Sequence, residues 1–454
     1  MGLRLDIRQD LQDFQDLQDK LLACIHCGLC LEACPTYVIT GNENDGPRGR
    51  LYLMRAVAEG RLENTSTAFA THIDRCLGCR ACEQVCPAGV EYGQLLEASR
   101  EVLLEAQPKS DLANRLLRFV LRHVWLSPGR LRMFFGASRV FRDLGLARLL
   151  LKTGLMPQRV RFGMALLESS KGVSHATAQR RNGSGKGAAE SVLLFKGCVG
   201  EGLFARVNRA TERVLRANDF EVETPAEQVC CGALHAHAGD LEGARELARK
   251  NIAAFDSDAP IITNAGGCGA MLKTYAHLFP SDERAANFSA RVRDVSQQLA
   301  TTEMRTAPSP TGQSVTYDTS CHLMYGQGSG EASERMMRYV TGKDFVPLNG
   351  TERCCGAAGV YNLLQPEMSQ RVLKEKLDHI KDTGAGILAT GNPGCQMHIG
   401  AGACLSGMKL RVCHPIEIVD QAYEAAGYYD PQSENTKYLR TDPDPDRNRG
   451  VRHT

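Results

Sequence analysis

The 454-residue sequence is poor in aromatic residues, nearly neutral and without a long apolar run. Aromatic residues make up 6%, with a single tryptophan, and the formal net charge is +2. A balanced charge gives no general attraction to nucleic acid, so we expect no nucleic-acid partner. The absence of an apolar run of about 18 residues excludes a predicted membrane-spanning helix. The beginning of the chain does not resemble a signal peptide, and we therefore expect a cytoplasmic protein.

Cysteine, by contrast, is abundant. The chain has 18 cysteines, and in a reducing compartment such residues bind metal more often than they pair as disulfides. Hydrophobic residues at 43% and charged residues at 23% are ordinary for a globular protein. The length allows two or three domains.

Eight of the cysteines form two runs of identical spacing, "CIHCGLCLEACP" from residue 24 and "CLGCRACEQVCP" from residue 76. Each run is Cys-x2-Cys-x2-Cys-x3-Cys-Pro, the bacterial ferredoxin pattern in which the fourth cysteine ligates the other cluster. On that template one [4Fe–4S] cluster is held by Cys24, Cys27, Cys30 and Cys86. The second is held by Cys76, Cys79, Cys82 and Cys34. A pair of zinc sites is the alternative, but zinc sites usually show separated Cys-x2-Cys knuckles.

The loop "GNENDGPRGR" lies between the two runs. Its Arg48 and Arg50 either offset the negative charge of cluster and thiolates or are simply exposed. His26 and Arg80, inside the cysteine runs, are expected to be solvated.

The chain divides into six predicted parts. A ferredoxin-type domain (1–108) begins with an amphipathic helix around Leu11, Phe14, Leu17 and Leu21. A basic helical segment (109–168) follows, with eleven Lys or Arg and one acid between Arg115 and Arg161. We expect that segment to face anionic lipid or a partner, or to pack on the protein's own core. The remaining parts are a flexible linker (169–190), two repeated units (191–310 and 311–428) and a disordered tail (429–454).

The repeat is visible in three pairs of stretches. "SVLLFKGC" matches "SVTYDTSC", "EQVCCGALHAHAGD" matches "TERCCGAAGVYNLL", and "PIITNAGGCGAM" matches "GILATGNPGCQMH". Each apolar run ends in a turn with cysteine and is followed by a helical pattern, which predicts an α/β unit with a mainly parallel sheet. The fold expected is therefore α+β and multidomain: a helical bis-[4Fe–4S] domain followed by two α/β units packed as a pseudo-symmetric pair.

Loops at the carboxyl ends of parallel strands build sites, so the cysteine loops of each unit should converge. They form a candidate additional metal or redox site at Cys198, Cys230, Cys231 and Cys268, and at Cys321, Cys354, Cys355 and Cys395. The alternative is that they are buried as small apolar groups, which we expect for Cys404 and Cys413. The histidines near these loops are expected to form hydrogen bonds rather than to bind metal: His235, His237, His322, His398 and His414.

The order of these motifs resembles the iron–sulfur subunits of bacterial glycolate oxidases. The resemblance runs from about residue 10 to 427 and includes "CIHCGLCLEACPTY", "DGPRGRLYLM", "CCGALHAHAGD", "CCGAAGVYNL", "GCQMH" and "HPIEIVDQA". Iron–sulfur subunits of glycerol-3-phosphate dehydrogenase and lactate-utilisation systems, and heterodisulfide reductase subunits, share the architecture. In the last group each unit ends in Cys-x-x-Cys, whereas here Met271 and His398 occupy the final position. That departure argues against a disulfide reductase.

The resemblance implies a non-catalytic, electron-transfer subunit of a 2-hydroxy-acid dehydrogenase complex. Two FAD-binding partner subunits would oxidise glycolate to glyoxylate, and this chain would pass the electrons toward a quinone-type acceptor. Such a role implies a peripheral position on the cytoplasmic face of the inner membrane. The residues agree, because no Gly-x-Gly-x-x-Gly follows a predicted strand and no base stands beside a set of arginines. The substrate of the partners stays open among glycolate, D-lactate and glycerol 3-phosphate.

Overall fold

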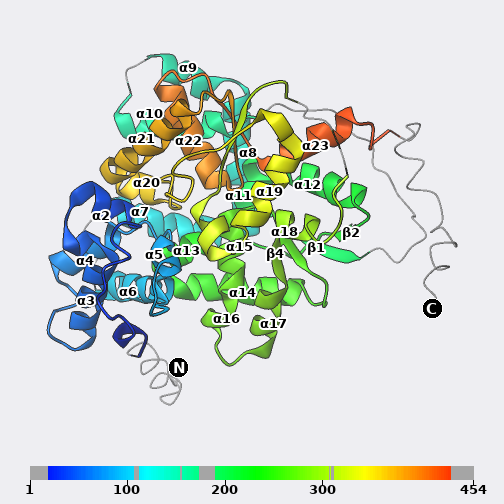
Figure 1. The fold of residues 1–454 in the computed structure, drawn as a ribbon. Coiled ribbons are helices and arrows are strands. Elements are labelled where there is room, and N and C mark those ends of the chain that lie inside the picture. Colours follow the sequence, from blue (N-terminus) through cyan, green and yellow to red (C-terminus); the bar gives the residue numbers. More distant parts are fainter. Residues whose placement is uncertain are drawn as a thin grey trace, which may run out of the picture.

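The computed structural model describes residues 19–106, 112–153, 156–172, 190–305, 307 and 311–430. The N-terminal part is helical and packs around the two cysteine runs (Figure 1, blue). Its apolar core combines Leu51, Phe69, Ile73 and Leu96 with cysteines of both runs. Prolines directly after Cys34 and Gly46 begin two of the helices, where a missing N–H costs nothing. The helices are α2 (Pro35–Thr40), η1 (Glu43–Asp45), α3 (Pro47–Ala58), α4 (Thr67–Asp74), α5 (Ala81–Gln84) and α6 (Tyr92–Ala106).

Of the amphipathic helix expected at the N-terminus, only residues 19–22 are described, and they are helical. The rest of that helix lies outside the described residues, as do 173–189 of the expected linker and 431–454 of the expected tail.

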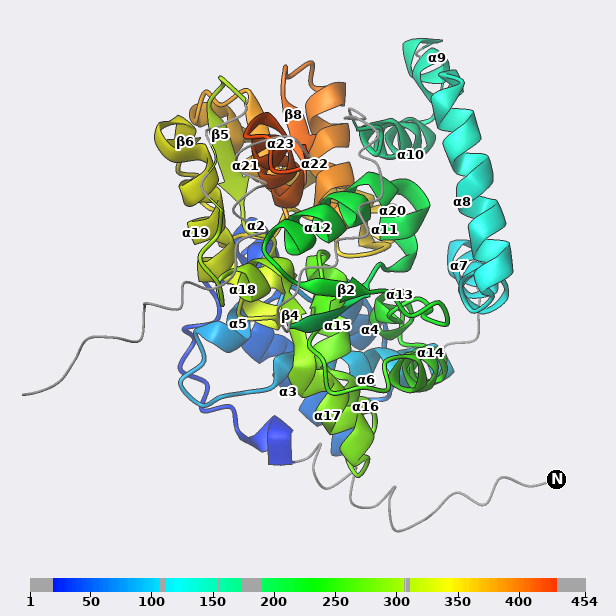
Figure 2. The same cartoon turned by 90° about the vertical axis from the view of Figure 1, so that its right-hand side faces the viewer.

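The basic segment is helical, as expected, and forms a column along one side of the molecule (Figure 2). One face of this column packs on the repeated units: Leu131 and Phe135 enter the core beside Leu203, while Phe162 and Ala165 pack beside Ile399. The expectation that the segment packs on the protein's own core is therefore correct for that face. Its elements are α7 (Leu112–Val120), the π-helical η2 (Leu121–Trp125), α8 (Pro128–Asp143), α9 (Leu146–Thr153) and α10 (Gln158–Ser169).

Each repeated unit contains a four-stranded parallel sheet. The first has the order β2-β1-β3-β4 and the second the equivalent order β6-β5-β7-β8. The central strands are buried on both faces, as parallel strands covered by helices must be, and they are mostly apolar, although β5 includes Thr316 and Asp318. The strands are β1 (Ser191–Phe195), β2 (Glu221–Glu223), β3 (Ile261–Thr263), β4 (Val292–Asp294), β5 (Val315–Asp318), β6 (Phe345–Val346), β7 (Ile387–Thr390) and β8 (Arg411–Cys413).

Helices cover both sheets. In the first unit they are α11 (Cys198–Leu203), α12 (Ala205–Ala217), α13 (Ala233–His237), α14 (Leu241–Ala254), α15 (Gly266–Lys273), α16 (Tyr275–Leu278), α17 (Glu283–Arg291) and α18 (Val295–Leu299). In the second they are η3 (His322–Gly326), α19 (Gly330–Thr341), η4 (Gly342–Asp344), α20 (Tyr361–Leu364), α21 (Pro366–Asp382), α22 (Pro393–Leu405) and α23 (Pro415–Ala425).

The two units share one hydrophobic core. Val192 and Leu194 of β1 belong to the same buried cluster as Val315 and Tyr317 of β5. Polar contacts join the units as well: the Gly266 N–H donates to the Gly391 carbonyl at 2.9 Å. The units therefore pack as a pseudo-symmetric pair, which confirms the predicted fold class. Among the described residues, no helix is both long and apolar enough to cross a membrane.

Candidate metal centre

A first cavity in the ferredoxin-type part is lined by Cys24, Cys27, Cys30 and Cys86. Three of these thiols come from the first run and one from the second. The first run can curl around the cavity because Gly28 adopts a φ of 85°, in the left-handed region that glycine enters without strain. The structure thus brings together the four residues that the ferredoxin template assigns to one cluster.

A second cavity is lined by Cys76, Cys79, Cys82 and Cys34. Here the second run supplies three thiols and the first run supplies the fourth. Cys82 also lines the first cavity, so the two cavities are neighbours. The Cys76 sulfur accepts hydrogen bonds from the Gly78 N–H at 3.4 Å and from the Tyr92 hydroxyl at 3.6 Å.

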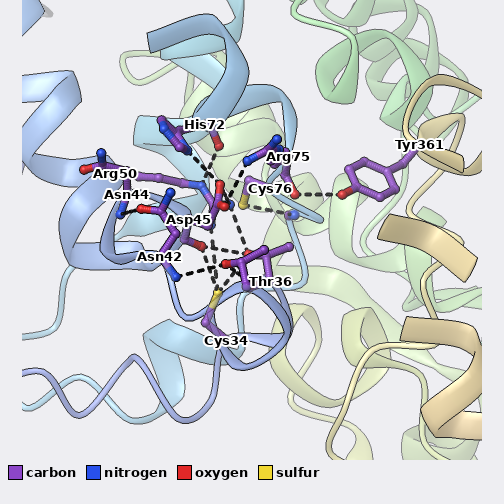
Figure 3. Close-up of polar contacts among 12 residues, drawn as sticks. Cys34, Thr36, Asn42, Asn44, Asp45, Arg50, His72, Arg75, Cys76 and Tyr361 are labelled. Atoms are coloured by element: carbon purple, nitrogen blue, oxygen red, sulfur yellow. Dashed lines mark hydrogen bonds and ion pairs between the residues drawn. The ribbon is translucent and has the colours of Figure 1, made fainter. Parts of the chain in front are cut away.

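A buried arginine lies beside the second cavity (Figure 3). Arg50 is fully buried, and its Nη1 donates to the Cys34 sulfur at 3.9 Å. Its Nε donates to the His72 carbonyl at 2.7 Å and its Nη2 to the Thr36 hydroxyl at 3.0 Å. Of the two roles open to Arg50 from sequence, the structure therefore excludes exposure and places its charge at the cysteines. Arg48 instead lies near the surface and donates to the His26 carbonyl.

The buried carboxylate of Asp45 holds this arginine network in place. Asp45 lies 3.9 Å from Arg50, 3.1 Å from Arg75 and 2.8 Å from the Nδ1 of His72. A buried charge is tolerated only when it is paired and hydrogen-bonded in this way. Sequence analysis missed both Asp45 and His72, because they lie 27 residues apart and no local pattern links them.

The positive charges act on the thiols. Burial opposes ionisation of Cys76, but the charges of Arg50 and Arg100 outweigh it and lower the pKa of this thiol. Burial and neighbouring thiols raise the pKa of Cys79 and of Cys82 well above the ordinary value. Burial by itself lowers the pKa of Arg50, but the negative charge of Cys76, Tyr92, Cys34 and Asp45 raises it overall. The guanidinium thus stays charged, and the site favours thiolate at Cys76.

The donor set fits an iron–sulfur cluster. Four cysteine sulfurs are the soft ligands such clusters require, and a hydrogen-bonded, positively charged surrounding stabilises the negative cluster and its thiolates. Among the described residues, no three His, Cys, Asp or Glu side chains are placed to hold a single metal ion.

In the first repeated unit the cysteine loops meet at the ends of the strands. The sulfurs of Cys198 and Cys230 are 3.3 Å apart. The neighbouring Cys230 thiol lowers the pKa of Cys231, but the Cys268 thiol and burial outweigh it and raise that pKa well above its ordinary value. The backbone of the adjacent cysteines Cys230 and Cys231 is held by two hydrogen bonds. The Asn251 amide donates to the Cys230 carbonyl at 3.0 Å, and the Tyr275 hydroxyl donates to the Cys231 carbonyl at 2.8 Å.

The second unit repeats this arrangement with a different support. The sulfurs of Cys355 and Cys395 are 3.0 Å apart, and those of Cys321 and Cys354 are 3.9 Å apart. Where the first unit has the hydrogen bonds of Asn251 and Tyr275, the second unit has a buried ion pair between Lys376 and Asp318, at 2.7 Å. Negative charge at Asp318 and the cysteines keeps this lysine charged, because it outweighs burial and raises the pKa of Lys376.

The second unit also contacts the second cavity. Cys79 packs in one apolar cluster with Cys321, Cys354 and Tyr361, and the hydroxyl of Tyr361 donates to the Arg75 carbonyl at 2.8 Å. The cysteines of the first unit are not part of that cluster. Sequence analysis did not predict this contact, since it joins residues more than 200 positions apart.

Two histidines connect the ferredoxin-type part with the two repeated units. The ring of His237, from the first unit, stacks on the ring of His322, from the second, with centroids 5.4 Å apart. His322 Nε2 in turn contacts the Gly78 carbonyl, in the loop of the second cavity, at 3.1 Å. Burial lowers the pKa of both histidines, so both are neutral at ordinary pH.

The remaining predicted residues divide as follows. His235, His398 and His414 are buried and hydrogen-bonded, as expected. Cys413 is buried as expected. The prediction for Cys404 is wrong: this cysteine is exposed and lies near the end of α22. His26 is exposed as expected, whereas Arg80 is half-buried and paired with Glu83 at 2.8 Å.

Comparison with known families agrees with this geometry. Residues 20–90 match the family "4Fe-4S dicluster domain", and residues 192–273 and 315–400 each match the family "Cysteine-rich domain". Fold and site together define an iron–sulfur protein with a dicluster module and two cysteine-rich domains.

Similar proteins narrow the class. The chain is 36% identical to the probable glycolate oxidase iron-sulfur subunit of Bacillus subtilis, over 94% of this chain and 99% of that protein. It is 32% identical to the glycolate oxidase iron-sulfur subunit of Escherichia coli, over 89% and 94%. Lactate utilization protein A of Oceanobacillus iheyensis is 33% identical over 50% of this chain and 96% of its own length. The chain belongs to the family of glycolate oxidase iron–sulfur subunits.

Proposed function

We propose that this chain carries electrons from a flavoprotein that oxidises glycolate to a quinone-type acceptor. The observation that carries the proposal is the pair of neighbouring four-cysteine cavities, each completed by a cysteine from the other run. Iron–sulfur clusters accept and release single electrons, and two adjacent clusters make a short path for them. The names of the full-length relatives support glycolate as the partners' substrate.

The proposed ligands are those that line the cavities: Cys24, Cys27, Cys30 and Cys86 for one [4Fe–4S] cluster, and Cys76, Cys79, Cys82 and Cys34 for the other. The chain's own residues position these thiolates and balance their charge. Arg50 places a cation at the second set, and the Gly78 N–H and the Tyr92 hydroxyl donate to Cys76. Cys34, Cys76 and Cys82 of the second set are buried, which limits the access of water to them. We also propose that the chain is divided into the six parts predicted from the sequence.

The cysteines of the repeated units are proposed as an additional metal or redox site, with the second unit as the stronger candidate. Its thiols at Cys321 and Cys354 belong to the same apolar cluster as Cys79 of the second cavity, so a redox group there would lie near a cluster. Disulfide reduction is not proposed, because Met271 and His398 stand where the reductase pattern requires cysteine. The ring of His398 contacts Ser369 and Asn362.

The proposed partners are two FAD-binding subunits, and the proposed location is the cytoplasmic face of the inner membrane. D-lactate is the second candidate substrate of the complex, supported by the likeness of half the chain to lactate utilization protein A.

The proposal is tested by measuring glycolate oxidation with an artificial dye. We expect no turnover by the isolated chain, because the proposed hydride acceptor is the FAD of the partner subunits. We expect turnover after the flavin subunits are added. Rapid turnover by the isolated chain without flavin would contradict the proposal. Replacing glycolate by D-lactate in the same assay distinguishes the two candidate substrates.

A further inference from the structure

Exposed apolar side chains are concentrated on the helical column. Of the 19 large hydrophobic residues that are exposed in the described part of the chain, ten lie between residues 116 and 160. Single exposed apolar residues need no explanation, but a contiguous group of them marks an interaction surface. The ten are Leu116, Phe119, Met133, Phe134, Val140, Leu144, Leu146, Leu149, Leu150 and Val160.

Their spacing shows that α8 has two apolar faces. Leu131 and Phe135 point into the core and are buried. Met133, Val140 and Leu144 recur at helical spacing on the opposite side, where they are 76%, 60% and 71% exposed. A helix that only covers a core needs one apolar face, so the second face has another purpose.

Helix α9 continues this pattern. Its Ala147 is fully buried, while Leu146, Leu149 and Leu150 are exposed. The column stands along one side of the molecule, so its outer side is uncovered in Figure 2. We call the exposed apolar residues of α8 and α9 the outer face: Met133, Phe134, Val140, Leu144, Leu146, Leu149 and Leu150.

Cations flank the outer face. Arg130, Arg132 and Arg139 of α8 and Arg148 and Lys152 of α9 are exposed. Asp143 is the one acidic residue between 115 and 161, and it is paired with Arg142 at 2.9 Å. Among the described residues, Arg130, Arg132 and Arg139 form no ion pair with an acid. The face is thus apolar along its centre and positive along its margins.

We propose that the outer face binds the surface of an anionic phospholipid bilayer. Apolar side chains between arginines are the composition of a helix that lies in a membrane interface, where the side chains enter the acyl region and the cations meet phosphate. Protruding side chains on an outer helix suit a deformable surface, since a protein partner would have to supply a matching groove. The inference deepens the proposed membrane location by naming the surface that makes the contact, and it does not depend on the electron-transfer proposal.

Co-sedimentation of the full chain with vesicles tests the proposal. We expect binding to phosphatidylcholine vesicles that contain phosphatidylglycerol, little binding to phosphatidylcholine alone, and weaker binding at high salt. The variant M133S/V140S/L144S should lose at least about tenfold in affinity. The variant R132E/R139E should lose at least roughly fivefold in affinity for each arginine replaced. Circular dichroism and cluster absorbance check that each variant is folded.

Matched controls use exposed residues elsewhere. Tyr339→Ser and Leu363→Ser remove exposed apolar side chains from the second unit, and Arg335→Glu reverses an exposed charge on α19; none should change binding. Binding that ignores both anionic lipid and salt, or that survives the triple substitution, would overturn the proposal. So would a wild-type chain that ignores vesicles while the triple variant loses affinity for the flavin subunits, because the face would then be a protein interface.

Discussion

Arg50 ties the second cluster site to the fold at the level of a single side chain. It follows a proline and a glycine in a loop-to-helix sequence typical of an exposed turn, yet it is fully buried. It is paired with Asp45 at 3.9 Å and donates to Cys34 at 3.9 Å. Such partners behind the ligands fix their orientation and tune a metal site. We infer that Arg50 positions the ligands of the second cluster and raises its reduction potential.

Replacing Arg50 by Gln should make the potential of the second cluster more negative. Removing a cation beside the cluster should cost the reduced form about 1–2 kcal/mol, or roughly 40–90 mV for one electron. Redox titration monitored by EPR measures this shift. Arg50→Lys keeps the charge and should shift the potential less, which separates charge from folding defects. Arg55→Gln, on the exposed side of the same helix, is the control; equal potentials in Arg50→Gln and Arg55→Gln would contradict the role of Arg50.

Each run supplies one cysteine to the cavity of the other run, and this arrangement allows a second prediction for single residues. Cys86 is the fourth cysteine of the second run but lines the first cavity with Cys24, Cys27 and Cys30. Cys86→Ser should therefore alter the EPR signal of the cluster held by the first run, and Cys34→Ser should alter that of the second cluster. The two variants serve as controls for each other. The assignment is wrong if each substitution changes only the cluster of its own run.

At the level of elements, His414 begins α23 and joins the two units. Its Nδ1 accepts the Ile416 N–H at 3.1 Å, which caps the helix. Its Nε2 then carries the proton and donates to the Asn264 carbonyl of the first unit at 2.7 Å. The contact with the Ile416 N–H needs the neutral ring, because a protonated ring has no acceptor at Nδ1. Burial lowers the pKa of His414 to about 4 and so keeps the ring neutral.

Stability should therefore fall with acid in a way that depends on His414. The pKa in the folded state lies below the ordinary value of about 6.5, so the contribution is complete above pH 6.5 and is lost as pH falls toward 4. Between pH 7.5 and 5.5 the loss should be roughly 1.4 kcal/mol. His414→Gln should be less stable than the wild type at pH 7.5, and thermal unfolding should show this gap narrowing at pH 5.5. A gap that does not change with pH would contradict this account, and His123→Gln, on the exposed η2, should show no gap.

The sequence predicted elements where a pattern is local or repeated. Spacing within each ferredoxin run predicts that its first three thiols line one cavity, and the ferredoxin template supplies the fourth thiol from the other run. The repeat of β1 in β5 predicts equivalent sheets. The burial of Arg50 could not be predicted, because it depends on the carbonyl of His72 in α4 and the carboxylate of Asp45 in η1, which only the packing of α3 on these two elements supplies. The exposure of Cys404 was missed for the same reason: the sequence does not show which side of α22 faces the sheet.

At the level of the whole molecule, the second cluster site lies where the ferredoxin-type part meets both repeated units. The Gly78 carbonyl contacts His322, which stacks on His237. Arg100 donates both to the Cys76 carbonyl at 2.7 Å and to the His237 carbonyl at 3.1 Å. A substitution in the second unit should therefore change the EPR signal of the second cluster.

The pseudo-symmetry supplies a matched pair of variants for that prediction. Cys321→Ala removes a thiol that packs against Cys79, whereas Cys198→Ala removes its counterpart, which packs beside Trp125 instead. We expect EPR to show a changed signal of the second cluster in Cys321→Ala and an unchanged one in Cys198→Ala. Equal effects of the two substitutions would mean that the contact between Cys79 and the second unit does not set the properties of the cluster.

The central claim is that electrons from glycolate pass through the two clusters of this chain. Freeze-quench EPR on the complex reconstituted with its flavin subunits measures this directly. We predict that glycolate reduces both clusters in the complex as fast as it is turned over, and reduces neither in the isolated chain. Full-rate electron transfer to a quinone while both clusters stay oxidised would contradict the claim.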